Sequence, residues 1–377
     1  MNHSKKIIYH SKAWAILSRS FQAKRTAGTY LFHGAPGSGR WQLSVALAAL
    51  VNCEQPSTTE ADLPVVTPCG ECRNCRNIFA LNFPGLHIAV PIPPHRNQDE
   101  AVDRTNEIIQ AKRDEPYRII SSSASTNIPV SVAREIKKNL SRKADEGVTR
   151  VVLFYQMERM KTSSADALLK MIEEPPADTI IVLVAQKPES LLPTIQSRAQ
   201  KVGTSRVAPD DIKTYLLERY DLADERAKLL ARIAEGSIGR AVDMLDTVDD
   251  DRASKRAMIF FLFKSLFVNG AAEMLAHMDE VLNARDRGEA DELLRLWQLL
   301  IRDCAGLAVT DDESSITNID FSADVKKLAP HFANHRLADD MIGNIKITLA
   351  DLRRNVHTQG ALMALALRLR SDIRAAS

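Results

Sequence analysis

The chain has 377 residues, of which 45% are hydrophobic and 26% charged, and its formal net charge is +2. These values are ordinary for a globular protein of two or three domains, and they exclude nucleic-acid binding through a globally basic surface. The longest apolar run, 257–268, is interrupted by Lys264 and is too short to cross a bilayer. The first residues lack the apolar core of a signal peptide, so we expect a cytoplasmic protein.

The stretch 34–41, Gly-Ala-Pro-Gly-Ser-Gly-Arg-Trp, has the frame of a phosphate-binding loop, G-x-x-x-x-G-K-[ST]. The glycines of this frame are Gly34, Gly37 and Gly39. A strand-like stretch, 30–32, precedes the loop, and a helix-like stretch, 43–51, follows it. In a working loop the Lys reaches the β- and γ-phosphates and the Ser or Thr hydroxyl ligates Mg²⁺. Arg40 replaces the Lys here and Trp41 replaces the hydroxyl, so we expect the fold of an ATPase without its chemistry.

A second catalytic position of such an ATPase is changed as well. The run 150–156 predicts a buried parallel strand. The end of this strand should carry one or two acids that hold Mg²⁺ and polarise the attacking water, but Tyr155 and Gln156 stand there. The nearest acid, Glu158, lies beyond the strand end, where we expect an ordinary surface residue. Lesions in both the metal ligand and the acid pair are hard to compensate.

Four cysteines are grouped after the loop and its helix. Cys53 is followed by Cys69, Cys72 and Cys75, which form two overlapping C-x-x-C steps. Four thiolates suffice for a tetrahedral structural zinc site, and a closed set of four protein ligands argues against a catalytic one. Four reduced cysteines without metal remain the alternative. Cys304 stands alone, and we expect it to be a buried apolar residue.

The remaining pattern alternates helices and strands and then becomes helical. Amphipathic helices are expected at 12–21, 130–140 and 161–176, and a buried strand at 179–185. The proline-rich, charged stretch 85–127 suggests a surface insertion. Alternating strands and helices indicate an α/β domain whose parallel sheet is covered on both faces. Short charged helices follow from 207, and residues from about 253 are expected to be helical throughout.

At this point the chain resembles the bacterial clamp-loader subunits of the AAA+ class. The motifs that carry the resemblance are Ala-Leu-Leu-Lys-Met-Ile-Glu-Glu-Pro-Pro at 167–176, Leu-Leu-Pro-Thr-Ile-Gln-Ser-Arg at 191–198, Gly-Ser-Ile-Gly-Arg-Ala at 236–241, the cysteine cluster, and the helix that begins near 354–356. Their shared order is more specific than any one of them. The match is weakest at 85–127 and 250–345.

The resemblance implies three domains: an AAA+ P-loop domain at 1–206 with a zinc module at 53–75, a helical lid at 207–252 and an all-α collar at 253–377. It implies that Arg198 is an arginine finger that reaches the γ-phosphate held by a neighbouring subunit. Arg240 matches the second sensor arginine, for which we expect a structural role here. The chain would be a non-hydrolysing part of the DNA polymerase III clamp loader, with structural Zn²⁺ of its own and ATP held by its neighbours.

The partners implied are the motor and clamp-opening subunits of a hetero-oligomeric ring and, through it, the sliding clamp and primed DNA. Two other functions stay open from the residues alone. One is an active ATPase in which Arg40 replaces the Lys, and the other is a zinc-containing scaffold that binds nucleic acid. A structural ion pair remains the alternative for Arg198.

Overall fold

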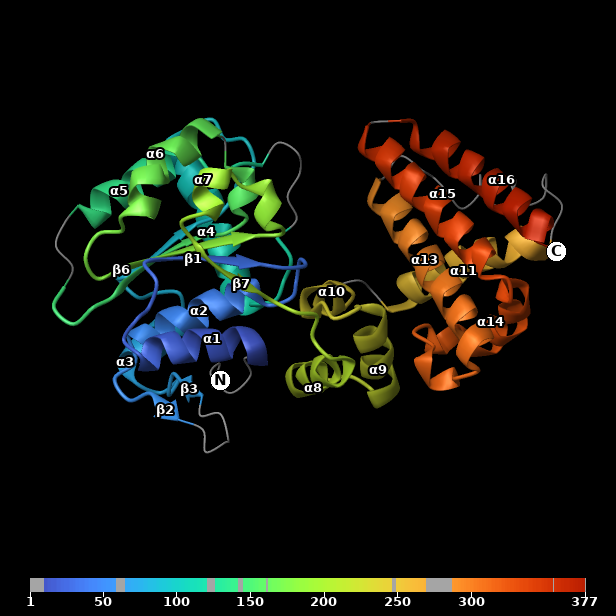
Figure 1. Cartoon of the computed structure of the whole chain (residues 1–377), viewed down its shortest axis with the longest axis horizontal. Coiled ribbons are helices and arrows are strands. Elements are labelled where there is room, and N and C mark those ends of the chain that lie inside the picture. Colours follow the sequence, from blue (N-terminus) through green and yellow to red (C-terminus); the bar gives the residue numbers. More distant parts are fainter. Residues whose placement is uncertain are drawn as a thin grey trace. The chain divides into compact units, whose positions relative to one another are not determined.

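The computed structural model describes residues 10–58, 65–120, 126–141, 145–160, 162–245, 249–268, 287–354 and 356–376. The chain divides into two compact units, drawn mainly in blue and green and mainly in orange and red in Figure 1. The N-terminal unit is Met1–Leu222 with Ala234–Met244, and the C-terminal unit is Ala223–Ile233 with Leu245–Ser377. Among the described helices, none combines the length and apolar character that a membrane span requires.

A parallel sheet of five strands forms the centre of the N-terminal unit, in the order β4-β5-β6-β1-β7. The strands are β1 (Thr29–His33), β4 (Leu86–Ala89), β5 (Arg150–Phe154), β6 (Thr179–Ala185) and β7 (Gln200–Gly203). The central strands β5 and β6 are buried along their whole length, and β1 is buried except at His33. Strands buried on both faces have continuous apolar sequences rather than alternating ones, which explains why these three were evident from the sequence.

Helices cover both faces of this sheet (Figure 1). Helices that pack on it include α1 (Ser11–Gln22), α2 (Arg40–Val51), α5 (Val130–Leu140) and α6 (Thr162–Glu173). Successive strand residues point to opposite faces, so Tyr30 and Phe32 pack with α1 and α2, whereas Leu31 packs with α5 and α6. The predicted α/β domain with a parallel sheet covered on both faces is confirmed. Lys161, the predicted start of α6, lies outside the described residues.

The stretch 85–127 is more than the surface insertion that we expected. Its first residues form β4, which pairs in parallel with β5 at the sheet edge. Residues Gln98–Asp114 form helix α4, in which Ala101 and Lys112 are the buried residues. A four-residue edge strand and a helix with so few buried positions carry little hydrophobic periodicity, and the sequence pattern therefore missed both. Residues 121–125 lie outside the described residues.

The remaining elements of the N-terminal unit frame its two ends. They are the hairpin of β2 (Ser57–Thr58) and β3 (Val66–Thr67), α3 (Arg73–Phe79), α7 (Pro193–Gln196), α8 (Pro209–Arg219), α10 (Ile238–Asp243) and the single turns η2 (Met157–Arg159) and η3 (Pro188–Ser190). Helices α8 and α10 belong to the same compact unit as the sheet, whereas α9 (Asp224–Ile233) belongs to the C-terminal unit. The three-domain division at 206 and 252 stays a prediction.

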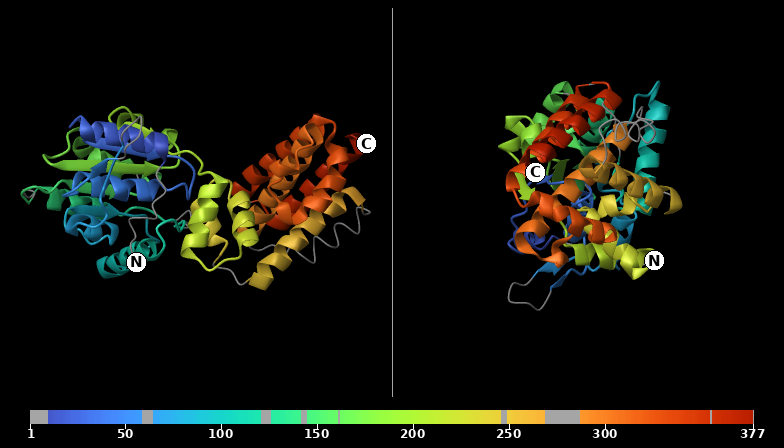
Figure 2. Two further views of the ribbon diagram at one scale, coloured as in Figure 1. Left: turned by 90° about the horizontal axis from the view of Figure 1, so that it is seen from below. Right: turned by 90° about the vertical axis from the view of Figure 1, so that its right-hand side faces the viewer.

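The C-terminal unit is helical throughout its described residues. Its other elements are α11 (Asp249–Val268), α13 (Arg287–Thr310), η4 (Glu313–Ser315), η5 (Ile319–Phe321), α14 (Ser322–Leu328), η6 (Ala329–Phe332), α15 (His335–Arg353) and α16 (Thr358–Ala376). Helices α11, α13, α15 and α16 contact one another as a bundle, visible in both views of Figure 2. Trp297 and Phe263 are fully buried in its core. The expected helix across 269–286, and Asn355 near the start of the closing helix, lie outside the described residues.

Candidate functional site

The loop between β1 and α2 depends on its glycines. Gly34, Gly37 and Gly39 have positive φ angles of 151°, 71° and 95°, a region that residues with a Cβ rarely adopt. A Cβ on Gly37 would also lie 2.3 Å from the Oγ of Ser237. Gly39 is the N-cap of α2, so Arg40 is the first helical residue. The glycine frame seen in the sequence therefore shapes the loop and sets where the helix starts.

The two substituted positions of the loop are both buried. The Arg40 side chain is 3% exposed, and its Nη1 has no hydrogen-bond partner among the described residues. Burial lowers the pKa of Arg40, and the nearby Tyr155 and Glu158 oppose this shift. The indole of Trp41 packs edge-on against the ring of Tyr155, with 5.2 Å between the ring centroids. Two aromatic rings therefore meet where an ATPase of this frame would place a hydroxyl and an acid.

Strand β5 ends at Phe154, two residues earlier than predicted. Tyr155 is buried next, and Gln156 turns into the left-handed region with φ of 55°. The Nε2 of Gln156 donates to the carbonyl of Ile120 at 3.2 Å, and its Oε1 is buried without a partner among the described residues. Neither side chain carries the charge that would hold a divalent cation.

Glu158 is not the ordinary surface residue that we expected. Its Oε1 accepts a hydrogen bond from the backbone N–H of Gln186 at 3.3 Å, and its Oε2 is buried. The turn η2, which follows the left-handed Gln156, carries this carboxylate back toward Arg40. The expectation was wrong because a regular extension of the strand would have pointed Glu158 away. Its carboxylate is the acid that acts on Arg40, from beyond the end of β5.

Lys112 of α4 lies over both aromatic rings, at a place where the sequence predicted no functional group. Its Nζ is 5.3 Å from the ring centroid of Trp41 and 5.2 Å from that of Tyr155. The same Nζ donates to the carbonyls of Pro116 at 3.1 Å and Arg118 at 2.5 Å. The Lys112 side chain is 3% exposed. A cation held over two ring faces fills the space beside Arg40.

The pH dependence of stability should report this burial. Burial lowers the pKa of Lys112 to about 7; Glu115 and Asp243 favour its charged form, while Arg40 and Arg118 oppose it. The unfolded chain then binds more protons than the folded chain from about pH 7 to the ordinary lysine pKa of 10.5, so stability rises with pH in this window. Thermal melting from about pH 7 to about pH 9 should give a steeper rise for the wild type than for Lys112→Met.

Exposed Lys187 offers the control for that comparison, since Lys187→Met removes an ammonium group that folding leaves in water. Its melting curves should follow the wild-type slope. Equal slopes for the wild type and Lys112→Met would mean that Lys112 keeps its ordinary pKa in the folded chain.

The N-terminal end of α10 closes on the loop. The Oγ of Ser237 donates to the carbonyl of Pro36 at 2.9 Å, and the N–H of Gly239 donates to the carbonyl of Gly37 at 3.1 Å. Arg240, the residue at the sensor position, lies 3.6 Å from a carboxylate oxygen of Glu235. The structure therefore brings the start of α10 to the loop and holds Arg240 in an ion pair.

The four grouped cysteines lie together. Their sulfur atoms all lie within 4.8 Å of one another, and the Sγ atoms of Cys69 and Cys75 are 4.0 Å apart. A tetrahedral metal ion with sulfur at about 2.3 Å needs sulfur atoms about 3.8 Å apart, so the cluster fits such an ion. Backbone N–H groups donate to the sulfur atoms of Cys53, Cys69 and Cys72 at 3.3–3.4 Å. Burial opposes ionisation of Cys69, but these bonds and its neighbouring thiols lower its pKa to about 7.

The cysteine cluster is attached firmly to the sheet domain. Cys75 is fully buried, and Cys72 is the N-cap of α3. The indole of Trp14 donates to the carbonyl of Val66 at 3.0 Å, and the N–H of Val66 donates to the Oγ of Ser18 at 2.7 Å. The hairpin before the last three cysteines is thereby held on α1. Cys304 is buried in the C-terminal unit, far along the chain from this group.

Arg198 follows α7 on the surface, with its side chain 41% exposed. Its Nε lies 3.0 Å from Oε1 of Glu173, at the C-terminal end of α6, and its Nη1 donates to the carbonyl of Thr194 at 3.0 Å. The two motifs at 167–176 and 191–198 therefore meet at this ion pair. Arg198 is held from two sides while part of its guanidinium stays open to solvent.

The family model described as DNA polymerase III, delta subunit, matches residues 9–207, which include the loop, the cysteine cluster and Arg198. The chain belongs to this family.

Curated relatives extend the match over most of the chain. DNA polymerase III subunit delta' of Bacillus subtilis is 24% identical over 94% of this chain and 94% of its own length. The Escherichia coli protein of the same name is 24% identical over 85% of this chain and 82% of its own. Among solved structures, a DNA polymerase III gamma subunit-related protein from Thermotoga maritima is similar, with a TM-score of 0.40 and 16% sequence identity. The match covers 95% of this chain and 99% of the length of that protein.

Two charged residues near the loop, Lys112 and Glu115, escaped the sequence analysis. Lysines and glutamates in polar segments are usually solvated, so their residue types gave no signal. The one available hint was Tyr117, an aromatic residue in the otherwise polar segment 112–118, and it is buried. Their placement depends on β4 and α4, which the sequence did not predict.

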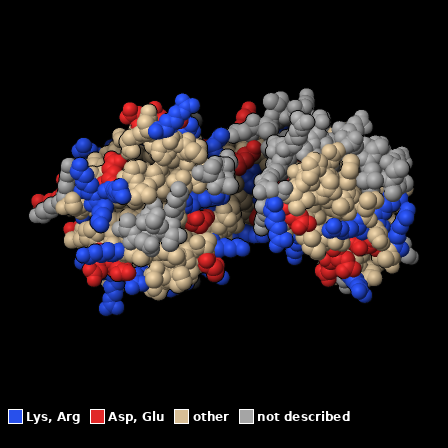
Figure 3. Space-filling view, turned by 90° about the horizontal axis from the view of Figure 1, so that it is seen from above, with Lys and Arg blue, Asp and Glu red and all other residues tan. Residues whose placement is uncertain are grey.

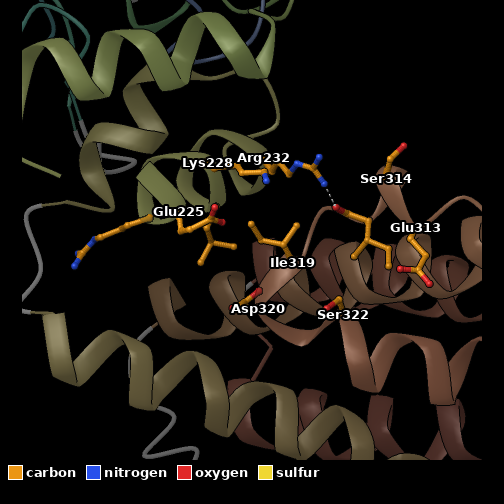
Figure 4. A pocket seen from close by; sticks show the side chains of 11 residues that line it. Glu225, Lys228, Arg232, Glu313, Ser314, Ile319, Asp320 and Ser322 are labelled. Atoms are coloured by element: carbon orange, nitrogen blue, oxygen red, sulfur yellow. Dashed lines mark hydrogen bonds between the residues drawn. The ribbon is translucent and has the colours of Figure 1, made fainter. Parts of the chain in front are cut away.

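Outside this region, the C-terminal unit has a pocket of about 720 Å³ between α9 and the segment η4 to α14 (Figure 4). Basic Lys228 and Arg232 line it together with acidic Glu225, Glu313 and Asp320, and Arg232 donates to the carbonyl of Ile316. The opposite charges and the absence of a converging nucleophile or ligand set among the described lining residues give it no catalytic character. On the face drawn in Figure 3, described Lys and Arg side chains are interspersed with Asp and Glu.

Proposed function

We propose that this chain is a non-hydrolysing subunit of the DNA polymerase III clamp loader. Its family and the delta' relatives support a place in that complex. The substituted loop supports the rest of the proposal: Arg40, Trp41, Tyr155 and Gln156 offer Mg²⁺ no serine or threonine hydroxyl and no carboxylate, and the Lys112 ammonium lies over the two rings. Phosphoryl transfer depends on that metal, so hydrolysis must occur on neighbouring subunits that hold ATP.

Arg198 is the residue through which the chain would act on a neighbour. A planar, permanently charged guanidinium suits the oxygens of a transferring phosphoryl group. The partly exposed position of Arg198, at the meeting of two family-like motifs, supports its role as a finger in trans. The ring would then open the sliding clamp and load it on primed DNA in the cytoplasm, with the C-terminal helices as its collar. Arg240, engaged with Glu235, would have a structural role.

A structural Zn²⁺ belongs to this proposal. Cys53, Cys69, Cys72 and Cys75 would hold it with four sulfur ligands, and such a closed set leaves no position for a substrate. The ion would fix the fold of the module between α2 and α3. It would take no part in phosphate chemistry.

ATP turnover tests the proposal at two levels. The isolated chain should hydrolyse no ATP above the buffer rate in the presence of Mg²⁺. Added to the motor and clamp-opening subunits, it should raise DNA-stimulated turnover and clamp loading. Hydrolysis by the isolated chain that disappears in Arg40→Ala would instead support an active ATPase. Equal turnover by the ring with and without the chain would remove the proposed role.

A further inference from the structure

We infer that the turn at residues 112–118, which follows α4, takes the place of a bound nucleotide as the link between the phosphate loop and helices α8 and α10. This inference goes beyond the proposed function, which concerns ATP on a neighbouring subunit. The link has three points of attachment, made by Lys112, Tyr117 and Glu115.

Lys112 attaches the turn to the former catalytic positions. Its ammonium group lies over the rings of Trp41 and Tyr155, at 5.3 and 5.2 Å from their centroids. The hydrogen bonds from Nζ to the carbonyls of Pro116 and Arg118 close the turn upon itself. The same side chain thus shapes the turn and anchors it beside Arg40.

Tyr117 wedges the turn between the loop and α10. A Cβ on Gly39 would lie 3.2 Å from the Tyr117 ring, and a Cβ on Gly239 would lie 2.3 Å from the Tyr117 carbonyl oxygen. Glycine at 239 is therefore required by this backbone approach. Gly239 in turn donates to the carbonyl of Gly37 at 3.1 Å. The loop, the turn and α10 form one continuous contact.

Glu115 attaches the turn to α8. The side chain is 5% exposed, and its carboxylate accepts from the hydroxyl of Tyr215 at 2.8 Å, from Nε of Arg219 at 2.9 Å and from the hydroxyl of Tyr220. The N–H of Tyr117 donates to the same carboxylate at 3.1 Å. The rings of Tyr117 and Tyr215 pack edge-on with 5.0 Å between centroids. A buried carboxylate with four donors is a stable anchor, since each bond to a charged acceptor is stronger than a neutral one.

The turn and a nucleotide cannot occupy the space beside the loop at the same time. A nucleotide needs the space next to the loop and Arg40, where Lys112 and Tyr117 lie buried. Their departure would carry Glu115 away from Tyr215, Arg219 and Tyr220 and leave these donors on α8 without their acceptor, which is a costly state. The chain should therefore hold α8 and α10 on the loop whether or not nucleotide is present.

Hydrogen exchange of the full-length chain, followed by mass spectrometry, tests the link. In Glu115→Ala we expect the amides of α8 and the Gly239 segment to exchange at least about tenfold faster, while those of the central strands β1 and β6 keep their protection. In the wild type, Mg-ATP or Mg-ADP should leave exchange of the loop, α8 and α10 unchanged. Glu100→Ala is the matched control, because it removes from the helix that precedes the turn a carboxylate paired with Arg104 at the surface.

Tyr220→Phe is the milder variant should Glu115→Ala fail to fold, because it removes one donor to Glu115 and keeps the ring. It should accelerate the same amides by less. Unchanged exchange in α8 and α10 of a folded Glu115 or Tyr220 variant would overturn the inference, and so would protection of these helices by nucleotide in the wild type. The measurement uses the isolated chain, so its outcome is independent of whether Arg198 acts on a neighbour.

Discussion

Replacing Arg198 with alanine should lower ATP hydrolysis at the motor site that this chain completes by on the order of 10³-fold. An arginine finger stabilises charge on the phosphoryl oxygens in the transition state, and alanine offers nothing in its place. Loss of the surface ion pair with Glu173 should change the stability of the chain by at most about 1 kcal/mol, so the variant should fold and assemble normally. A large loss of activity with unchanged assembly therefore separates a functional arginine from a structural one.

Single-turnover phosphate release by the reconstituted ring is the best measurement, because the other motor sites would mask one silent site at steady state. Lys201→Ala is the matched control, since it removes an exposed cation that bonds to Gln196 at 3.2 Å on the same surface. Arg198→Lys keeps the charge without the planar fork, and we expect it to restore little of the rate. Full phosphate release by the ring that carries Arg198→Ala would mean that Arg198 has only a structural role, in its ion pair with Glu173.

Replacing Cys69 with serine should release the metal ion from the cysteine module. We expect about one zinc ion per wild-type chain and close to none in the variant, because a hydroxyl does not replace a thiolate ligand. The loss of a metal site should cost more than about 3 kcal/mol of local stability. For a unit of this size that corresponds to a melting temperature lower by roughly 6–12 °C, measured with and without a chelator.

Cys304→Ser controls for the loss of a thiol, since Cys304 is buried in the C-terminal unit, whereas the other four cysteines belong to the N-terminal unit. It should keep the full zinc content. Limited proteolysis should show where the Cys69 variant has opened, and new cleavage is expected within 53–79. Equal metal content in the Cys69→Ser and wild-type chains would favour four reduced cysteines without metal.

The central strands and several helices could be predicted because burial leaves a signature in the sequence. The limits predicted for 130–140 and 179–185 match those of α5 and β6. The pattern failed at β7, where Val202 is the one buried residue in a short strand. It failed likewise at β4 and α4. Short edge strands and polar helices gain their place from tertiary contacts, which a local pattern does not record.

The candidate site was predictable where a motif fixes both residue type and spacing. Arg40 and Trp41 stand out because they depart from the residues that the phosphate-loop motif requires. The four cysteines stand out because their spacing fits that of metal ligands. Lys112 and Glu115 belong to no frame. They reach the loop through a helix whose sequence resembles a solvated surface, and only the fold reveals that both charges are buried and bonded.

The ion pair of Arg198 with Glu173 has a consequence for how the ring would form. A free arginine side chain populates many rotamers, and fixing them at an interface costs up to about 2 kcal/mol of conformational entropy. Here Glu173 and the carbonyl of Thr194 already restrict the guanidinium within the unassembled chain. A neighbour would thus meet a side chain that is ordered beforehand, and assembly would require an exchange of one oxygen partner for another rather than the ordering of a mobile group.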